Sequence, residues 1–262
     1  MPNVHQSEFL RIAMWSGPRN ISTAMMRSWG NRPDTIVVDE PLYAYYLKAT
    51  GKDHPMAREI IAAGETDWRK VVTDLTESRY KGPFQISPRK DGSHIAPQVF
   101  YQKHMTHHLL PEMGRDWLAG LKNCFLIRDP AEVITSYIRK NEDPTLEDVG
   151  FVQQAEIFEW ERERSGKVPP VIDARDVLQN PERTLRLLCD AVGIEFDRAM
   201  LSWPQGLRET DGVWAKHWYG EVAKSTGFEP YRARHSEVPE RLRDIEARCR
   251  TCYETLYQYR LR

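Results

Sequence analysis

The chain has 262 residues, of which 40% are hydrophobic and 29% charged, and its formal net charge is −1. These values are typical of one globular domain with a full core, and the near-neutral charge excludes a protein-wide attraction to nucleic acid or to an anionic membrane. No signal peptide or membrane-spanning run is found. We therefore expect a single-domain cytoplasmic protein over residues 1–262, of unknown oligomeric state, that binds no nucleic acid and no membrane.

Short apolar runs alternate with helix-like segments along the chain. Strands are predicted at residues 11–15, 35–38, 99–102, 123–127 and 171–173. Helices are predicted at residues 20–29, 67–80, 131–140, 147–163 and 181–191. This alternation predicts an α/β fold of three layers, in which a parallel sheet is flanked by helices on both faces. In such folds ligands bind beyond the carboxyl ends of the strands, which directs attention to residues 16–23, 39–41, 103–108 and 128–136.

The first of these segments leads from a strand into a helix. A helix N-terminus favours an oxyanion through its free N–H groups and its dipole. The surrounding residues supply a tight turn and further donors: Gly17, Pro18, Arg19, Asn20, Ser22 and Thr23. We expect this loop to bind a phosphate or sulfate group, although Ser22 and Thr23 could instead only cap the helix. It is not a Walker A loop, because it lacks that motif's spacing and lysine.

The residues after the third strand include one lysine and several histidines. If the strand continues, Lys103 and His104 point to opposite sides of the sheet. His104, His107 and His108 could also form a metal site, but no nearby carboxylate or thiolate motif supports zinc.

The segment after the fourth strand also leads into a helix. Asp129 is predicted as the N-cap and Pro130 as the first helical residue, which places Ser136 about two turns along. Asp129 would repel an anion on the helix axis, so a phosphate here should lie to the side, held by Arg128 and Ser136. Alternatively, Arg128 is only a salt-bridged residue at a strand end.

Three further features have mainly structural interpretations. Cys249 and Cys252 lie on one apolar face of a predicted helix with residues 242, 245 and 256, which favours a place in the core over redox or metal chemistry. Residues 81–97 and 205–230 lack periodicity and are predicted as long surface loops, which are often lids or substrate walls. A set of aromatic residues could belong to the core or line an acceptor pocket: Tyr43, Tyr45, Tyr46, Trp203, Trp214 and Trp218.

Taken in order, these motifs resemble the PAPS-dependent sulfotransferase superfamily, which has a P-loop nucleotide-binding fold and uses 3′-phosphoadenosine 5′-phosphosulfate (PAPS). Arg128 and Ser136 have the eight-residue spacing of the family's arginine and serine for the 3′-phosphate, and residues 17–23 resemble its 5′-phosphosulfate loop. Residues 102–111 are similar to the Lys-Thr-His segment of cytosolic members, and residues 171–181 to their stretch before an Asn-Pro helix start. The resemblance covers roughly residues 11–200. Arg19 replaces the usual lysine, and the family's C-terminal donor contacts have no clear counterpart, although Lys216, Lys224 or Arg232 could replace their cations.

The resemblance implies transfer of a sulfuryl group from PAPS, as co-substrate, to a hydroxyl or amine of a small-molecule acceptor, without a metal. It implies donor binding by the two loops, that is by Gly17, Pro18, Arg19, Asn20, Ser22, Thr23, Arg128 and Ser136, with Arg19 also stabilising the leaving phosphate. His104 falls on the family's catalytic base, and Glu40 is a rival because some Golgi-type members use a glutamate. A P-loop small-molecule kinase and a non-catalytic sulfonucleotide-binding module are the alternatives.

Overall fold

A computed structural model describes residues 10–77, 96–233 and 237–262 of the chain. Its centre is one parallel sheet with the strand order β2-β3-β1-β4-β5. The strands are β1 (Leu10–Ser16), β2 (Thr35–Asp39), β3 (Val99–Met105), β4 (Lys122–Ile127) and β5 (Val171–Asp173). All five predicted strands are present, but β3 continues to Met105, beyond its predicted end at residue 102.

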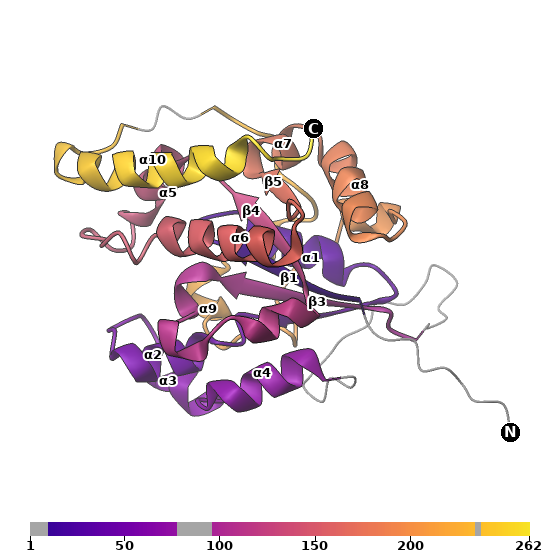
Figure 1. Ribbon diagram of the computed structural model, residues 1–262, viewed down its shortest axis with the longest axis horizontal. Coiled ribbons are helices and arrows are strands. Elements are labelled where there is room, and N and C mark those ends of the chain that lie inside the picture. The colour runs from indigo at the N-terminus through magenta and orange to yellow at the C-terminus, as the bar shows by residue number, and fades with distance from the viewer. Residues whose placement is uncertain (1–9, 78–95, 234–236) are drawn as a thin grey trace, which may run out of the picture.

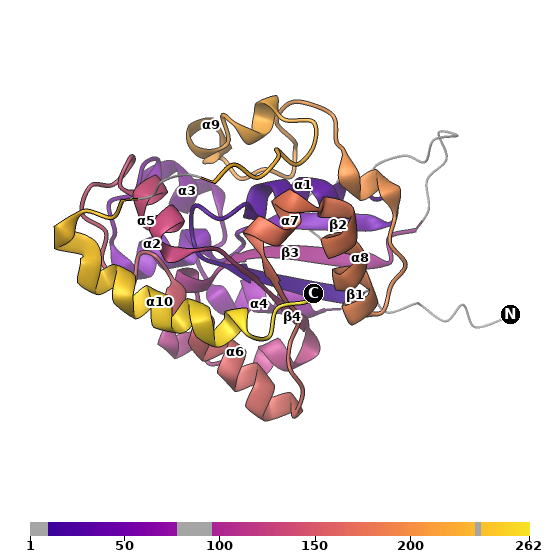
Figure 2. The same cartoon turned by 90° about the horizontal axis from the view of Figure 1, so that it is seen from above.

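Helices cover both faces of this sheet (Figure 1). They are α1 (Ser22–Gly30), α2 (Tyr43–Thr50), α3 (Ala57–Ala63), α4 (Trp68–Thr76), α5 (Pro130–Tyr137), α6 (Phe151–Ser165), α7 (Ala174–Gln179), α8 (Pro181–Val192), α9 (Ala215–Trp218) and α10 (Arg243–Tyr257). Figure 2 shows α1, α7 and α8 on one face, and α4, α6 and α10 on the other. The predicted three-layer α/β fold is confirmed, while the single domain over residues 1–262 stays a prediction.

The strands are apolar because both of their faces are buried. In β1, Ile12 and Met14 pack in the cluster on the α1 side, whereas Ala13 and Trp15 pack in the cluster on the α6 side. This alternation is the two-residue period of a strand. Cys249 belongs to the second cluster, and Cys252 packs against it from the same face of α10. The interpretation as core is thus confirmed for Cys249, whereas Cys252 is half-buried at the edge of the core.

The topology places four loops at one edge of the sheet. The chain builds β2 and β3 on one side of β1, then β4 and β5 on the other, so the strand order reverses beside β1. In register, Asp39 of β2 lies beside Lys103 of β3, and Ser16 of β1 lies between Met105 and Leu126. The carboxyl ends therefore meet at a topological switch point, where open α/β sheets bind ligands.

The segment of residues 205–230 is held against the sheet by buried polar contacts. Arg27 and Asp211 form a bidentate ion pair, with N···O distances of 2.5 and 2.6 Å, and both side chains are only 3% exposed. The Gly212 amide also donates to Asp39 at 3.2 Å. This segment is therefore a fixed wall of the molecule and contains α9. The other predicted loop, residues 81–97, lies almost wholly outside the described residues.

Several helix boundaries differ from those predicted. Helices α2, α3 and α7 were not foreseen, because each is short and its apolar residues show no long helical period. Helix α6 begins at Phe151 rather than residue 147, because Gly150 before it has a φ of 71°. Within the described ranges, no helix has both the length and the apolar character that a membrane crossing requires.

Candidate functional site

A cavity of about 770 Å³ opens at the carboxyl ends of the strands. This volume falls within the range of about 300–1,000 Å³ that is usual for small-molecule sites. The residues that line it come from the loop after β1, the ends of β2 and β3, helix α5 and the 214–232 segment. Among the predicted site residues, the lining includes Pro18, Arg19, Asn20, Ser22, Thr23, Glu40, Arg128 and Ser136.

The loop after β1 presents the start of α1 to this cavity. The N-cap residue is Ile21, and no side chain caps the helix, so the hydroxyls of Ser22 and Thr23 are not used for capping. The first N–H groups of a helix lack partners within the helix. Arg19 precedes them with a φ of 56°, in the left-handed region that a non-glycine residue adopts at a cost of about 1–3 kcal/mol. The strained turn thus keeps donors and a cation at one place, which suits an anion.

Gly17 does not line the cavity but allows the loop to pack closely against the segment before α6. A Cβ atom at Gly17 would lie 2.7 Å from the Val149 carbonyl oxygen. Gly150 is equally confined, because a Cβ there would lie 2.5 Å from the Thr106 hydroxyl oxygen. Gly17 therefore has a packing role in this loop, while its donor contact stays a prediction.

We expect Gly17→Ala to lower the free energy of unfolding by about 1–3 kcal/mol, because the added methyl group has no space against a backbone carbonyl. Urea unfolding of the variant and the wild type measures this difference. Gly120→Ala is the matched control, since nothing lies within 4 Å of a Cβ atom at Gly120. Equal destabilisation by both substitutions would contradict the packing role.

Asn20 fixes the same loop to the sheet. Its Nδ2 donates to the Leu126 carbonyl at 2.8 Å, and its Oδ1 accepts from the Ile21 amide at 3.0 Å. Gln154 of α6 adds a second brace, donating to the carbonyls of Trp15 and Leu126. Asn20 therefore positions the loop, and both polar atoms of its side-chain amide already form hydrogen bonds within the protein.

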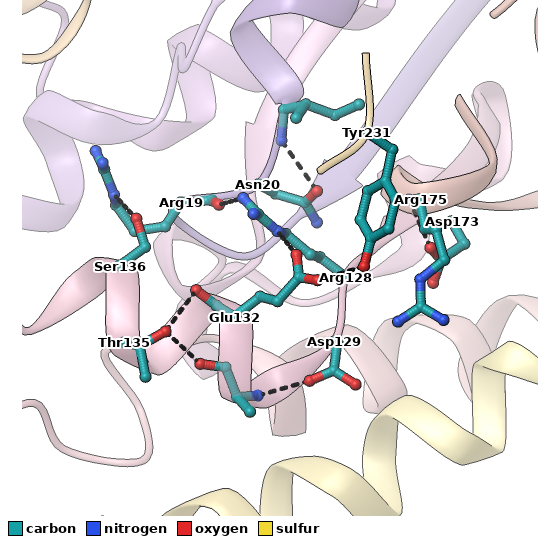
Figure 3. A network of polar contacts seen from close by, with 12 residues as sticks. Arg19, Asn20, Arg128, Asp129, Glu132, Thr135, Ser136, Asp173, Arg175 and Tyr231 are labelled. Atoms are coloured by element: carbon teal, nitrogen blue, oxygen red, sulfur yellow. Dashed lines mark hydrogen bonds and ion pairs between the residues drawn. The ribbon is translucent and has the colours of Figure 1, made fainter. Parts of the chain in front are cut away.

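The guanidinium group of Arg128 forms hydrogen bonds through two of its nitrogens beside this loop, as Figure 3 shows. Its Nη1 donates to the Arg19 carbonyl at 2.8 Å, and its Nε donates to Glu132 at 2.9 Å. Tyr231 donates to the other oxygen of Glu132 at 3.0 Å. The predicted salt bridge at the strand end is thus real, and it orients a cation that also lines the cavity.

Ser136 joins the two loops in an unforeseen way. Its hydroxyl accepts from Arg19 Nε at 3.0 Å (Figure 3), so Ser136 contacts the arginine of the first loop rather than Arg128. Burial, followed by the nearby cations Arg128 and Arg139, lowers the pKa of Arg19. Like charges gathered in this way favour an anion between them.

Asp129 is turned away from the cavity. As predicted, it is the N-cap of α5 and Pro130 is the first helical residue, with the Ala131 amide donating to Asp129 at 2.9 Å. Arg250 of α10 pairs with the same carboxylate at 2.6 Å. Arg250 therefore offsets the charge of the Asp129 carboxylate.

Glu40 and Lys103 form a buried polar cluster with Asp39 and Tyr219 in the cavity wall. Lys103 donates to Asp39 at 2.8 Å and to Tyr219 at 2.8 Å, and also donates to Glu40. Asp39 further accepts from Tyr219. Two carboxylates, Asp39 and Glu40, share the ammonium group of Lys103. With both carboxylates ionised, the cluster has a net charge of −1.

Glu40 is the carboxylate of this cluster that faces the cavity. Its φ of 42° is a second left-handed non-glycine conformation at the site. Burial raises the pKa of Glu40, against the opposing effect of Lys103, and Asp39 raises it further. A carboxylate with a raised pKa at a cavity wall is suited to accept a proton.

His104 does not lie in the cavity, which corrects the prediction of its role as base. Since β3 continues to Met105, Lys103 and Met105 face the cavity and His104 faces the opposite side of the sheet. There its ring stacks on Trp15 with 4.4 Å between the ring centres, and its Nε2 is hydrogen-bonded to Gln102 Oε1 at 3.1 Å. Only 1% of the His104 surface is exposed. Burial, and then Lys103, lowers its pKa to about 3. His104 is therefore a core residue.

His107 and His108, which the sequence suggested only as metal ligands, line the cavity instead. They pack against aromatic rings of α2, and His108 stacks on Tyr43 at 4.5 Å. Within the described ranges, no group of three or more His, Cys, Asp or Glu side chains is arranged to hold a metal ion. Their place in the cavity wall could not be read from the sequence, because only the folding of α2 brings the rings together.

The predicted aromatic set divides between cavity and core. Tyr43, Trp214 and Trp218 line the cavity. Tyr46 packs in the core, Tyr45 donates to Glu112 at 2.7 Å, and Trp203 packs on Phe228. Of the three cations suggested for the C-terminal part, Lys224 and Arg232 line the cavity whereas Lys216 does not.

Comparison with known proteins identifies one family over most of the chain. A family model described as "Sulfotransferase domain" matches residues 10–249. Two proteins of Arabidopsis thaliana are similar: branched-chain-amino-acid aminotransferase-like protein 1, 36% identical over 83% of this chain, and protein 2, 32% identical over 94%. The chain spans only 36% and 41% of the length of these relatives. A solved sulfotransferase domain from the curacin biosynthetic pathway is 17% identical, with a TM-score of 0.48, covering 95% of this chain and 98% of that one.

Proposed function

The chain belongs to the sulfotransferase domain family, and from this premise we propose that it transfers a sulfuryl group from PAPS to a hydroxyl or amine of a small-molecule acceptor. The observation that carries the proposal is the meeting of two cationic loops in one cavity that also contains a carboxylate. Arg19 and Arg128 are joined through the Arg19 carbonyl, and Glu40 lines the same cavity.

The sulfuryl donor carries anionic groups on the 5′ and 3′ positions of its ribose, and the two loops offer hydrogen-bond donors for each. Arg19 and the first amides of α1 would bind the 5′-phosphosulfate, as a cation and a helix N-terminus bind oxyanions. Arg128 would bind the 3′-phosphate mainly through its Nη2 group, since Nε donates to Glu132 and Nη1 donates to the Arg19 carbonyl. This fit uses residues that the fold already orients.

The proposed reaction is an in-line transfer. The acceptor oxygen or nitrogen forms a bond to sulfur while the bond from sulfur to the 5′-phosphate oxygen breaks, and the acceptor's proton passes to Glu40. Negative charge grows on the leaving phosphate, where Arg19 stabilises it. Lys103 keeps the Glu40 carboxylate in place, because it anchors Glu40 to Asp39 within the sheet.

We expect Arg128→Ala to weaken binding of adenosine 3′,5′-bisphosphate by about 10–150-fold, since charge-assisted hydrogen bonds contribute about 1.5–3 kcal/mol. Affinity for adenosine 5′-phosphate should hardly change, because it lacks the 3′-phosphate. Calorimetry with both ligands, on wild type and variant, gives a double difference that cancels general damage to the fold. Equal weakening of the two ligands would mean that Arg128 is structural and would remove this half of the donor site.

A turnover assay separates the proposal from its alternatives. Transfer of labelled sulfate from PAPS to a panel of alcohols, phenols and amines should proceed in excess EDTA. Activity with ATP that requires magnesium would instead favour the kinase. Tight binding of adenosine 3′,5′-bisphosphate without turnover of any acceptor would favour a non-catalytic binding module.

A further inference from the structure

The hydroxyl group of Tyr219 takes part in every direction in the buried cluster of the cavity wall. This residue directly follows α9 in the 205–230 segment and is 5% exposed. Its hydroxyl donates to the Asp39 carboxylate, whose two oxygens lie at 2.9 and 2.7 Å. It accepts from Lys103 Nζ at 2.8 Å and from Trp214 Nε1 at 3.2 Å. Since a hydroxyl has one proton and two lone pairs, these contacts use all of its hydrogen-bonding capacity.

The ammonium group of Lys103 is satisfied in the same way. It has three N–H donors and three partners, which are Asp39, Glu40 and Tyr219. Burial alone would lower the pKa of Lys103, but the two carboxylates raise it well above its usual value, so the group stays charged. Because the side chain is only 1% exposed, the ammonium cannot turn elsewhere without leaving a buried group unpaired.

The two carboxylates of the cluster differ in how their oxygens are occupied. Both oxygens of Asp39 accept hydrogen bonds, from Lys103 and Tyr219 and from the Gly212 amide at 3.2 Å. The Glu40 carboxylate accepts from Lys103 through Oε1, and within the described ranges its Oε2 has no hydrogen-bond partner. Oε2 is nevertheless not one of the buried polar atoms that lack a partner, and Glu40 lines the cavity. Oε2 is therefore the carboxylate oxygen that is open to the cavity.

We propose that Tyr219 and Asp39 are positioning residues for the sulfuryl transfer, which act through Lys103 to hold Glu40 with Oε2 open to the acceptor. This inference rests on the proposed function, since it names how the same cavity fixes its base. Glu40 remains the group that takes the proton. The 205–230 segment gains a part in the reaction, because it supplies the hydroxyl and the amide that bind Asp39.

The titratable groups around Glu40 decide the direction in which each substitution acts. Lys103 of β3 and Asp39 of β2 adjoin it, and Tyr43 of α2 and Tyr219 are close enough to sense its charge. Burial raises the pKa of both tyrosines, so they stay neutral near pH 7. Burial also raises the pKa of Glu40, Lys103 opposes this effect, and Asp39 raises the pKa further. A change that strengthens the field of Asp39 at Glu40 should therefore raise this pKa, and loss of the Asp39 charge should lower it.

The first test is Tyr219→Phe, which removes the hydroxyl and keeps the ring 5.2 Å from Lys103 Nζ. Asp39 then loses a donor and should draw the ammonium away from Glu40, so the acid limb of kcat/KM should move about 0.5 pH unit higher. The plateau of kcat should fall about tenfold or more, because a displaced reacting group is costly. Affinity for adenosine 3′,5′-bisphosphate should stay within about twofold. A folded variant with an unmoved limb would overturn the role of Tyr219.

Tyr253→Phe is the matched control for this variant. Tyr253 also donates from a buried hydroxyl to a buried carboxylate, Asp173, at 2.8 Å, and neither residue is part of the cavity lining. Each variant thus loses one buried hydrogen bond, so thermal unfolding should show comparable destabilisation. Only Tyr219→Phe should move the acid limb. An equal movement in both variants would mean general loosening of the fold and would overturn the inference.

Asp39→Asn gives an opposite readout and decides the question even if Tyr219→Phe fails to fold. Asparagine keeps an oxygen acceptor for Lys103 but removes the charge, so the acid limb should move about one pH unit lower. Adding Tyr219→Phe to Asp39→Asn should then shift the limb upward by clearly less than in the wild-type background, because the hydroxyl acts through the Asp39 charge. An unmoved limb in Asp39→Asn, or equal shifts in both backgrounds, would overturn the inference.

Two measurements separate this inference from the function on which it rests. Kinetics use labelled PAPS with the acceptor of highest turnover in the panel, and calorimetry with adenosine 3′,5′-bisphosphate tests the donor site alone. An acid limb that disappears in Glu40→Gln but is unmoved by Tyr219→Phe and Asp39→Asn would overturn only the positioning role. Absence of donor binding to the wild-type protein would overturn the proposed function itself.

Discussion

Replacing Glu40 by glutamine is expected to lower kcat for sulfuryl transfer by about 10²–10⁴, while the affinity for adenosine 3′,5′-bisphosphate stays within about twofold. Glutamine has nearly the same size and keeps a hydrogen-bond acceptor for Lys103, but it cannot take a proton at neutral pH. The fold should tolerate the change, because Asp39 still offsets the Lys103 ammonium at 2.8 Å. Single-turnover kinetics with a labelled donor and calorimetry measure the two effects.

His104→Phe is the matched control for this prediction. Phenylalanine keeps the ring that stacks on Trp15 and removes both ring nitrogens. We expect this variant to retain most of the activity, with thermal unfolding as a check on its stability. Strong loss of kcat in a stably folded His104→Phe protein, together with an active Glu40→Gln protein, would reverse the assignment of the base.

The pH dependence gives a second readout for Glu40. Burial raises its pKa, so the acid limb of kcat/KM should lie above the ordinary value for a glutamate, which is about 4.3. As the pH falls through the raised pKa, Glu40 takes up a proton and can no longer act as base, so activity is lost on the acid side. Any residual activity of Glu40→Gln should lack this limb. A limb that is unchanged in the variant would assign the titration to another group.

Replacing Arg19 by asparagine is expected to lower kcat/KM by about 10²–10³, because it removes the cation nearest the start of α1, where charge develops on the leaving phosphate. Asparagine is chosen because it adopts the left-handed backbone more readily than most residues, and Arg19 has a φ of 56°. Steady-state kinetics with a fixed acceptor measure the loss, and circular dichroism checks the fold.

Two further variants separate the role of Arg19 from the general charge of the region. Arg19→Lys keeps the charge but loses the planar fork, so it should retain part of the activity. Arg139→Ala removes an exposed cation that acts on Arg19 only through space, and should change kcat/KM by less than about threefold. Similar losses from Arg19→Asn and Arg139→Ala would show that only the overall field matters.

The sequence alone was sufficient for the layers of the fold and for the two arginine-bearing loops that meet at one edge of the sheet. Apolar runs bounded by polar residues predicted all five strands, because a strand buried on both faces must be apolar throughout. Residues that follow a parallel strand are brought to one edge by the topology, whichever strands are neighbours. Arg19 and Arg128 could therefore be placed together from their positions after β1 and β4, and the structure places both in one cavity.

Whether His104 faces the cavity depended on the length of one strand. The polar residues Lys103 and His104 suggested that β3 had ended at Gln102, yet it continues to Met105. Because side chains alternate along a strand, each residue's facing depends on where the strand stops. Lys103 and His104 thus face opposite sides, and the histidine predicted as base became a core residue while Glu40 remained in the cavity.

Contacts between distant parts of the chain were decided only by the tertiary structure. Tyr219 lies 180 positions from Asp39, and the fold brings its hydroxyl within 2.7 Å of that carboxylate. Gly17 meets the Val149 carbonyl in a similar way. Local sequence determines the helix or strand propensity of a segment and the period of its apolar residues. Contacts between distant residues depend instead on how the helices pack on the sheet, and the position of each layer depends on all the others. The sequence by itself thus determined the sheet and the loops that follow β1 and β4, whereas packing decided which carboxylate and which histidines line the cavity.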